Sequence, residues 1–424
     1  MNRAPTRRGE LNHTIKNNYI MMKIPFSLPV IDTDVINEMM DTLTNTGWLT
    51  TGPKTKALEE EIKKFTGVKE TLCVNSWTSG AMIILRWFGI GPGDEVIIPA
   101  YTYSATALCV MNVGATPVMV DVKDDFTINP DKIKQAITPK TKAIIPVDLG
   151  GWPCDYNHIY EIVNDSTILS QFKPTTERQK KLNRILILAD AAHSLGGYYE
   201  GKETGTIADI SIFSFQSVKN VTTGEGGGIC LNLPQPFDNS EELTFLRAFS
   251  LNGQNKSAYD KNQNGGWKYD IIDQGMKANM PDLCASVGLA QIRKYKSILL
   301  PERRRIFDFY SNSLKQYNWA HIPTYEKGKS ISSYHLYLLR INGINEQQRD
   351  QMIDMISKAG AGVNVHYTPM PLLTLFKNRG YKMEDYPKTF ALYQNEITLP
   401  VYNGLTEEQL KKVVQVVVKA YNSL

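Results

Sequence analysis

Two short apolar segments, each followed by reactive polar residues, constrain the fold more than any other part of the chain. The segments are Ile185–Leu188 and Ile210–Phe215, and polar or glycine residues bound both of them. Continuous apolar runs of this length are typical of strands that are buried on both faces of a parallel sheet. Asp190 follows the first run, Ser214 lies near the end of the second, and Lys219 comes a few residues later. Because the carboxyl ends of parallel strands meet at one edge, we expect a carboxylate, a hydroxyl and an amine to lie together there.

These three side chains have the chemistry of a pyridoxal phosphate (PLP) site. A lysine amine can form a Schiff base with the aldehyde of PLP, and a carboxylate beside the pyridine nitrogen keeps the ring an electron acceptor. A hydroxyl near the lysine can bind the cofactor phosphate, and the glycines within 224–228 let the backbone turn tightly and approach a ligand. Alternatively, Lys219 is an ordinary loop lysine and Asp190 caps a helix. Their joint placement at the ends of neighbouring strands favours the PLP site.

The motifs around these residues resemble those of the DegT/StrS family of PLP-dependent sugar aminotransferases. The resemblance runs from about Lys23 to the C-terminus, and its most specific segments are D-A-A-H-S-L-G-G and F-S-F-x-x-x-K-N-x-T-T-G-E-G-G. It implies that Lys219 is the catalytic residue that carries PLP, that Asp190 faces the pyridine nitrogen, and that Ser214 binds the phosphate. It also implies that His193 lies near the phenolic oxygen of the cofactor.

Further cofactor contacts are expected from the segments around residues 76 and 103. A helix is predicted to begin at Ser76–Thr78, and the free N–H groups at a helix start suit a phosphate, although a serine or threonine there can simply cap the helix. The segment N-S-W-T-S-G is similar to the phosphate-binding segment of the family, which implies contacts from Thr78 and Ser79. Tyr103 lies where the family stacks an aromatic ring on the pyridine; alternatively, it is a core tyrosine.

The resemblance implies substrate-binding and subunit contacts from distant parts of the chain. G-M-K-A-N-M-P-D is similar to a segment whose asparagine reaches across a homodimer to the cofactor phosphate of the neighbour, which implies that role for Asn279. Asn279 alternatively caps the helix that follows. Trp48 lies in a loop that resembles one near the sugar site, although an ordinary loop with one packed tryptophan fits equally well. His366 and Tyr367 match the H-Y-x-P segment at the rim of the sugar pocket.

The chain also departs from the family pattern near the predicted pocket. Asp148 replaces a frequent histidine, Trp152 a frequent glutamine, and Pro371 another histidine. We therefore expect a substrate pocket that differs from those of relatives, and the sequence does not identify the sugar, its nucleotide or the ring position. The polar insertion at residues 165–184 is expected to be a surface excursion without an assigned role.

Length and pattern predict an α/β protein with two domains. A chain of 424 residues exceeds one ordinary hydrophobic core. Strands that alternate with helical stretches favour a mainly parallel, doubly wound sheet, and the resemblance implies fold type I of the PLP-dependent transferases with a smaller C-terminal α/β domain. We expect a large PLP-binding domain at 23–275, followed by long helices and the small domain at 276–424. Residues 1–22 are expected to be a disordered extension or an over-long start.

Composition limits the partners and the location. The net charge of +4 is small for this length and gives no case for nucleic acid. No run of about twenty apolar residues predicts a membrane span. The five cysteines are scattered without a CxxC pair, so we expect neither a metal site nor a disulfide framework. The odd cysteine count and the lack of a signal peptide favour the cytoplasm.

The expected function is therefore amino transfer from an amino acid, with glutamate as the expected donor, to a keto group of a nucleotide-linked sugar. Such a reaction would serve cell-surface polysaccharide or related sugar biosynthesis, and the enzyme would act as a homodimer with shared active sites. Two alternatives remain open. One is a sugar dehydratase on the same scaffold, for which the resemblance implies a histidine where this chain has Lys219. The other is a non-enzymatic PLP-fold protein that binds or regulates.

Overall fold

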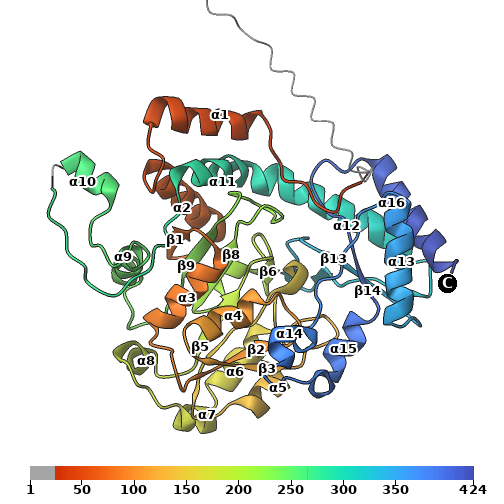
Figure 1. Ribbon diagram of the computed structural model, residues 1–424, viewed down its shortest axis with the longest axis horizontal. Coiled ribbons are helices and arrows are strands. Elements are labelled where there is room, and N and C mark those ends of the chain that lie inside the picture. The colour runs from red at the N-terminus through yellow and green to blue at the C-terminus, as the bar shows by residue number, and fades with distance from the viewer. Residues whose placement is uncertain (1–23, 265) are drawn as a thin grey trace, which may run out of the picture.

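A seven-stranded sheet forms the centre of the larger part of the chain (Figure 1). The computed structural model describes residues 24–264 and 266–424, so the extension expected at residues 1–22 lies outside the described residues. The strand order is β1-β9-β8-β5-β4-β2-β3. The strands are β1 (Glu70–Val74), β2 (Glu95–Pro99), β3 (Thr116–Val120), β4 (Thr141–Ile144), β5 (Leu186–Asp190), β8 (Ile210–Ser214) and β9 (Gly227–Leu231).

The parallel, doubly wound character of this sheet confirms the predicted fold class. All neighbouring strands pair in parallel except β9, which is antiparallel to both β1 and β8. Ile212 and Phe213 are consecutive in β8 and pack into different apolar clusters, one on each face of the sheet. A strand buried on both faces is what its continuous apolar run predicts.

Helices cover both faces of the sheet. They are α2 (Pro53–Thr66), α3 (Trp77–Trp87), α4 (Ala105–Asn112), α5 (Pro130–Ala136), α6 (Tyr156–Val163), α9 (Asn239–Phe249) and α11 (Asp282–Lys294), with α1 (Thr33–Asp41) and α10 (Ala258–Asn264) further out. Helix α1 begins after Asp32, whose side chain accepts a hydrogen bond from the backbone N–H of Val35 at 3.3 Å. Helix α3 is capped by Ser76, whose hydroxyl accepts a hydrogen bond from the backbone N–H of Ser79 at 3.1 Å.

A smaller antiparallel sheet lies in the C-terminal part. It contains β10 (Ala320–His321), β13 (Tyr337–Ile341) and β14 (Glu396–Leu399), and it packs with α12 (Leu300–Leu314), α13 (Glu346–Lys358) and α16 (Glu407–Tyr421) around one apolar cluster. The short helices α14 (Thr374–Lys377) and α15 (Pro387–Tyr393) precede its last strand. The strands β6 (Tyr198–Tyr199) and β7 (Lys202–Glu203) join β11 (Glu326–Lys327) and β12 (Ser330–Ile331) in a further sheet. A domain boundary at residue 275 stays a prediction.

The insertion at residues 165–184 is more than the surface excursion that we expected. It folds into α7 (Ser166–Gln171) and α8 (Glu177–Leu182). Gln179 of α8 is fully buried, and its Nε2 donates to the carbonyl oxygen of Phe88 at 3.0 Å. Its Oε1 accepts from the backbone N–H of Thr175 at 2.9 Å. The insertion therefore holds the C-terminal end of α3 in place.

Replacing Gln179 by Ala should lower the free energy of unfolding by about 1–3 kcal/mol, because buried hydrogen bonds are lost. Urea denaturation measures this change. Lys180→Ala, an exposed change on the same helix, is the matched control and should alter stability by less than about 0.5 kcal/mol. Equal stability of the two variants would contradict the inference that α8 holds the C-terminal end of α3 in place.

Candidate active site

A cavity of about 480 Å³ lies at the carboxyl ends of the parallel strands. Asp190 is the last residue of β5 and Ser214 the last residue of β8, and the start of α3 follows β1 at the same edge. The residues predicted for the site that line this cavity are Thr78, Tyr103, Asp190, His193, Ser214, Lys219, His366 and Tyr367. The expectation that polar groups from separate strands meet at one edge is therefore met.

The buried carboxylate of Asp190 and the half-buried side chain of Lys219 lie in the same cavity. The hydroxyl of Thr106 donates to Asp190 Oδ2 at 2.9 Å, and the N–H of Ala192 donates to Oδ1 at 3.2 Å. Burial raises the pKa of Asp190 to about 7, although these two hydrogen bonds and the charge of Lys219 oppose the rise. Burial lowers the pKa of Lys219 to about 8, and the Asp190 charge opposes that change. Each charge thus makes burial of the other less costly.

His193 is held as a neutral ring in one tautomer. The backbone N–H of Gly150 donates to His193 Nδ1 at 3.2 Å, so the proton belongs on Nε2, which lies 3.1 Å from the hydroxyl of Tyr367. Burial and the charge of Lys219 keep the pKa of His193 well below its ordinary value. Its ring also lies 4.5 Å from that of His335, a residue that the sequence interpretation missed.

The C-terminal part of the chain supplies His366 and Tyr367. Nδ1 of His366 lies 2.9 Å from the hydroxyl of Thr398, and its backbone N–H donates to Glu396 Oε2 at 3.0 Å. Burial lowers the pKa of His366 to about 3 and raises that of Glu396 to about 8. The small sheet thus fixes one wall of the cavity with uncharged groups.

Hydroxyls and a helix start gather at another part of the cavity wall. Ser76, Thr78 and Ser214 line it together with Gly226. A Cβ atom on the neighbouring Gly227 would come within 2.8 Å of Trp77 N, so β9 passes close to the start of α3 only because this residue is glycine. The expected tight turn lies at Gly224, whose φ of +79° is left-handed, and Gly227 in β9 serves close packing. The free N–H groups of a helix start and nearby hydroxyls suit a phosphate.

Three predicted residues do not line this cavity. The hydroxyl of Ser79 lies 2.7 Å from that of Ser76. The indole N–H of Trp48 donates to the carbonyl oxygen of Thr51 at 3.0 Å. Nδ2 of Asn279 donates to the Thr51 hydroxyl at 2.6 Å, and no side chain caps α11, so the helix-cap alternative for Asn279 is wrong.

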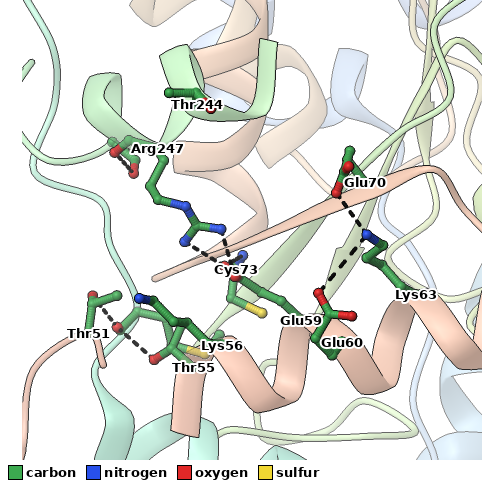
Figure 2. Close-up of polar contacts among 12 residues, drawn as sticks. Thr51, Thr55, Lys56, Glu59, Glu60, Lys63, Glu70, Cys73, Thr244 and Arg247 are labelled. Carbon is green, nitrogen blue, oxygen red and sulfur yellow. Dashed lines mark hydrogen bonds and ion pairs between the residues drawn. The ribbon is translucent and has the colours of Figure 1, made fainter. Parts of the chain in front are cut away.

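Asn279 lines a second cavity, of about 440 Å³, beside the edge strand β1. Figure 2 shows one wall of it, where Arg247 of α9 reaches Glu59 of α2. Arg247 Nη2 lies 2.7 Å from Glu59 Oε2, and Glu59 Oε1 accepts from the backbone N–H of Cys73 at 2.9 Å. A buried carboxylate bound in this way ties α2, α9 and β1 together.

The residues that depart from the family pattern do not line the cavity that Lys219 lines, although the backbone N–H of Asp148 donates to the carbonyl oxygen of Asp190 at 3.1 Å. Asp148 is fully buried and accepts hydrogen bonds from Cys154 N, the Tyr156 hydroxyl and the Ser194 hydroxyl at 2.8–2.9 Å. Trp152 lines a separate cavity of about 130 Å³. Asp148, Trp152 and Pro371 do not line the 480 Å³ cavity, and the expectation that the substrate pocket differs from those of relatives stays a prediction. The sequence offered one signal for a missed contact, since Thr106 is a hydroxyl residue within an otherwise apolar helical segment.

A lysine amine and a buried carboxylate at the ends of adjacent strands, in a sheet of this order, define a PLP-dependent enzyme of fold type I. The chain belongs to the DegT/DnrJ/EryC1/StrS aminotransferase family, whose model matches residues 30–170 and 175–418. It is accordingly a PLP-dependent aminotransferase.

Solved structures and curated relatives resemble the chain along almost its whole length. The putative sugar aminotransferase Spr1654 from Streptococcus pneumoniae, in its PMP form, is 42% identical with a TM-score of 0.90 and covers 94% of this chain and 99% of its own. The spore coat polysaccharide biosynthesis protein SpsC from Bacillus subtilis is 32% identical over 403 residues, which are 93% of this chain and 96% of that protein. Helicobacter pylori PseC, an aminotransferase involved in the biosynthesis of pseudoaminic acid, shares the fold at 24% identity and a TM-score of 0.81, covering 95% of this chain and 100% of its own.

The residues present fit PLP. The donor set combines an amine, a carboxylate, hydroxyls and a helix start, and these are the groups that an aldehyde, a pyridine nitrogen and a phosphate require. The close approach of β9 at Gly227 brings the helix start against the end of β8.

Among the described residues, no helix has both the length and the apolar character needed to cross a membrane.

Thr106→Val should weaken PLP binding roughly ten- to a hundredfold, because a hydrogen bond to a charged group is worth about 1.5–3 kcal/mol. Without the Thr106 hydroxyl the charged form of Asp190 loses a donor, and the pKa of this carboxyl rises further. Titration of the PLP-free protein with PLP, followed by absorbance, gives the dissociation constant. Ser104→Ala, which removes a nearby hydroxyl that caps no helix, is the control. An unchanged affinity in Thr106→Val would contradict the role of its hydrogen bond.

Proposed function

We propose that this protein transfers an amino group from an amino acid, with glutamate as the donor, to a keto group of a nucleotide-linked sugar. The observation that carries the proposal is that Lys219 and Asp190 line the same cavity. A sugar acceptor is supported by two relatives, one named a putative sugar aminotransferase and the other a spore coat polysaccharide biosynthesis protein. The product would serve cell-surface polysaccharide or related sugar biosynthesis in the cytoplasm.

The proposed cofactor contacts follow from the cavity wall. When bound, PLP supplies an aldehyde that takes up amino groups and a ring that accepts electrons. Lys219 would carry it and Asp190 would hold the proton at the ring nitrogen. Because a cation at that nitrogen stabilises the charged carboxylate, it would offset the burial that raises the pKa of Asp190. Thr78, Ser79 and Ser214 would bind the phosphate, and neutral His193 would lie beside the phenolic oxygen.

Lys219 would also move the proton during amino transfer. An amine with a pKa of about 8 is partly neutral at the pH of a cell, so Nζ can take up a proton and return it. Tyr103 keeps 61% of its surface exposed and offers a flat ring on which the pyridine can stack. His366, Tyr367 and Trp48 would bind the sugar. The dehydratase alternative is disfavoured because Lys219 lines the cavity where a histidine is implied for that branch.

The proposal includes a homodimer with shared active sites. Asn279 and Trp48 lie outside the cavity of their own subunit, which supports a role in the cavity of a partner. The segment 267–272 carries exposed apolar side chains, namely Trp267, Tyr269, Ile271 and Ile272. Contiguous exposed apolar surface is typical of a subunit interface.

Lys219→Ala should remove both the absorption band of bound PLP and turnover, because no other amine is proposed to hold the cofactor or to move the proton. The assay incubates each protein with glutamate and a panel of nucleotide-linked keto sugars and reads amino sugar formation by mass spectrometry. Lys202→Ala, an exposed lysine on β7, is the control and should be fully active. Full activity of Lys219→Ala would refute the proposed role of this lysine, and wild-type inactivity on the whole panel would refute the acceptor class.

A mixture of inactive Lys219→Ala and weakened Asn279→Ala subunits should regain activity. In a mixed dimer, one shared site receives Lys219 from one subunit and Asn279 from the other, so it is intact. Random exchange of subunits makes about half of the dimers mixed, and each mixed dimer has one of its two active sites restored. Activity equal to the average of the two variants before mixing would show that Asn279 acts within its own subunit or not at all.

A further inference from the structure

His335 contacts the residue that follows Lys219. It lies just before β13, is 4% exposed, and its Nδ1 is 2.7 Å from Asn220 Oδ1. Nδ2 of Asn220 donates to the Tyr295 hydroxyl at 2.9 Å and to the carbonyl oxygen of Ser333 at 2.8 Å. The Oδ1 atom is therefore the acceptor, and His335 Nδ1 carries the proton that it donates. This bond links the small sheet to the loop that carries Lys219.

His335 also contacts the cavity from a second direction. Its ring lies 4.5 Å from that of His193, with an interplanar angle of 39°. His335 and Lys219 both line a small cavity of about 30 Å³, which shares Lys219, His366 and Tyr367 with the larger one. His335 is thus the neighbour of two groups that the proposed reaction uses.

The surroundings hold His335 rigidly and without charge. Arg303 of α12 donates to the carbonyl oxygens of Tyr334 and His335 at 3.0 and 2.9 Å, which fixes the backbone on either side of the ring. Burial, together with the nearby His193, Lys219, Arg303 and His366, keeps the pKa of His335 well below its ordinary value. A neutral ring with a fixed donor atom can orient its neighbours without competing for their protons.

We propose that His335 is a positioning residue that aligns Lys219, through Asn220, with the ring of His193. The inference rests on the proposed role of Lys219 as the residue that carries PLP. Lys219 reaches the cavity from a loop beyond the end of β8, so its amine depends on side-chain contacts for a fixed position. A displacement of about 1 Å in a reacting group can cost roughly a hundredfold in rate.

His335→Phe keeps a flat ring but removes the donor to Asn220. It should lower kcat roughly ten- to a hundredfold while KM changes less than about threefold, because substrate contacts remain and alignment is lost. His335→Asn, whose side-chain N–H lies near the position of Nδ1, should recover part of the loss. His321→Phe, at an exposed histidine of β10, is the matched control. A rise in the KM of His335→Phe as large as the fall in its kcat, or an unchanged kcat, would overturn the proposal.

The uptake of PLP by the PLP-free protein gives a readout that is independent of turnover. Neutral Lys219 reacts with the aldehyde, so the wild-type uptake rate should rise with pH through about 8. His335→Phe should take up PLP several-fold more slowly at each pH, per folded molecule as judged by its thermal transition. A lower melting temperature with normal uptake by the folded fraction would mean a structural role only and would refute positioning.

Asn220→Ala tests the same link without changing His335. If the pair acts as one unit, the double variant Asn220→Ala/His335→Phe should lose no more kcat than the more impaired single variant. Additive losses would overturn the link, and Asn220→Ala alone decides the question if His335→Phe does not fold. Failure of the proposed role of Lys219 differs visibly from these outcomes, because wild-type protein would then show no uptake at position 219, and failure of the proposed sugar acceptor would leave the expected uptake by every variant unchanged.

Discussion

The opposite charges of Asp190 and Lys219, which line one cavity, are the constraint on which the rest of the structure depends. A buried ion without a partner is expensive, whereas a paired and hydrogen-bonded one is tolerated. Parallel pairing of β5 with β8 brings the loop after one strand beside the carboxylate that ends the other. Thr106 and Ala192 complete the surroundings of the carboxylate. The sheet order is therefore also the arrangement that places these two opposite charges in one cavity.

The site is assembled by both parts of the chain. His193 follows β5 of the large sheet, but its ring is held by Tyr367 and lies against His335, which belong to the C-terminal part. Arg303 of α12 in turn fixes the backbone around His335. Because these contacts cross between the two sheets, a shift of the smaller sheet would disturb the cofactor wall before it disturbed the larger core.

The parts of the site that could be predicted are those recorded in local sequence. Asp190 and Ser214 end apolar strands, and Ser76 precedes a helical pattern, so each could be placed from its neighbours in the chain. Thr106 and His335 were missed because their partners are distant in sequence; the hydroxyl of Thr106 stands out in an apolar helical segment, but that pattern does not identify its partner. The glycine run was predicted only in part: Gly224 forms the expected turn, but Gly227 begins β9 and allows close packing against α3, which the sequence pattern did not indicate.

The arrangement around Asp148 has a consequence for how this lineage can change. The carboxylate accepts three hydrogen bonds from three separate groups and donates none. The resemblance leads one to expect a histidine there. A neutral histidine has a single acceptor nitrogen, so it would leave some of the three groups that now donate to the aspartate without an acceptor. Tyr156 and Ser194 would have to be exchanged together with it. A histidine introduced at position 148 alone would therefore lower stability, so any change to histidine there passes through a less stable protein unless its neighbours change with it.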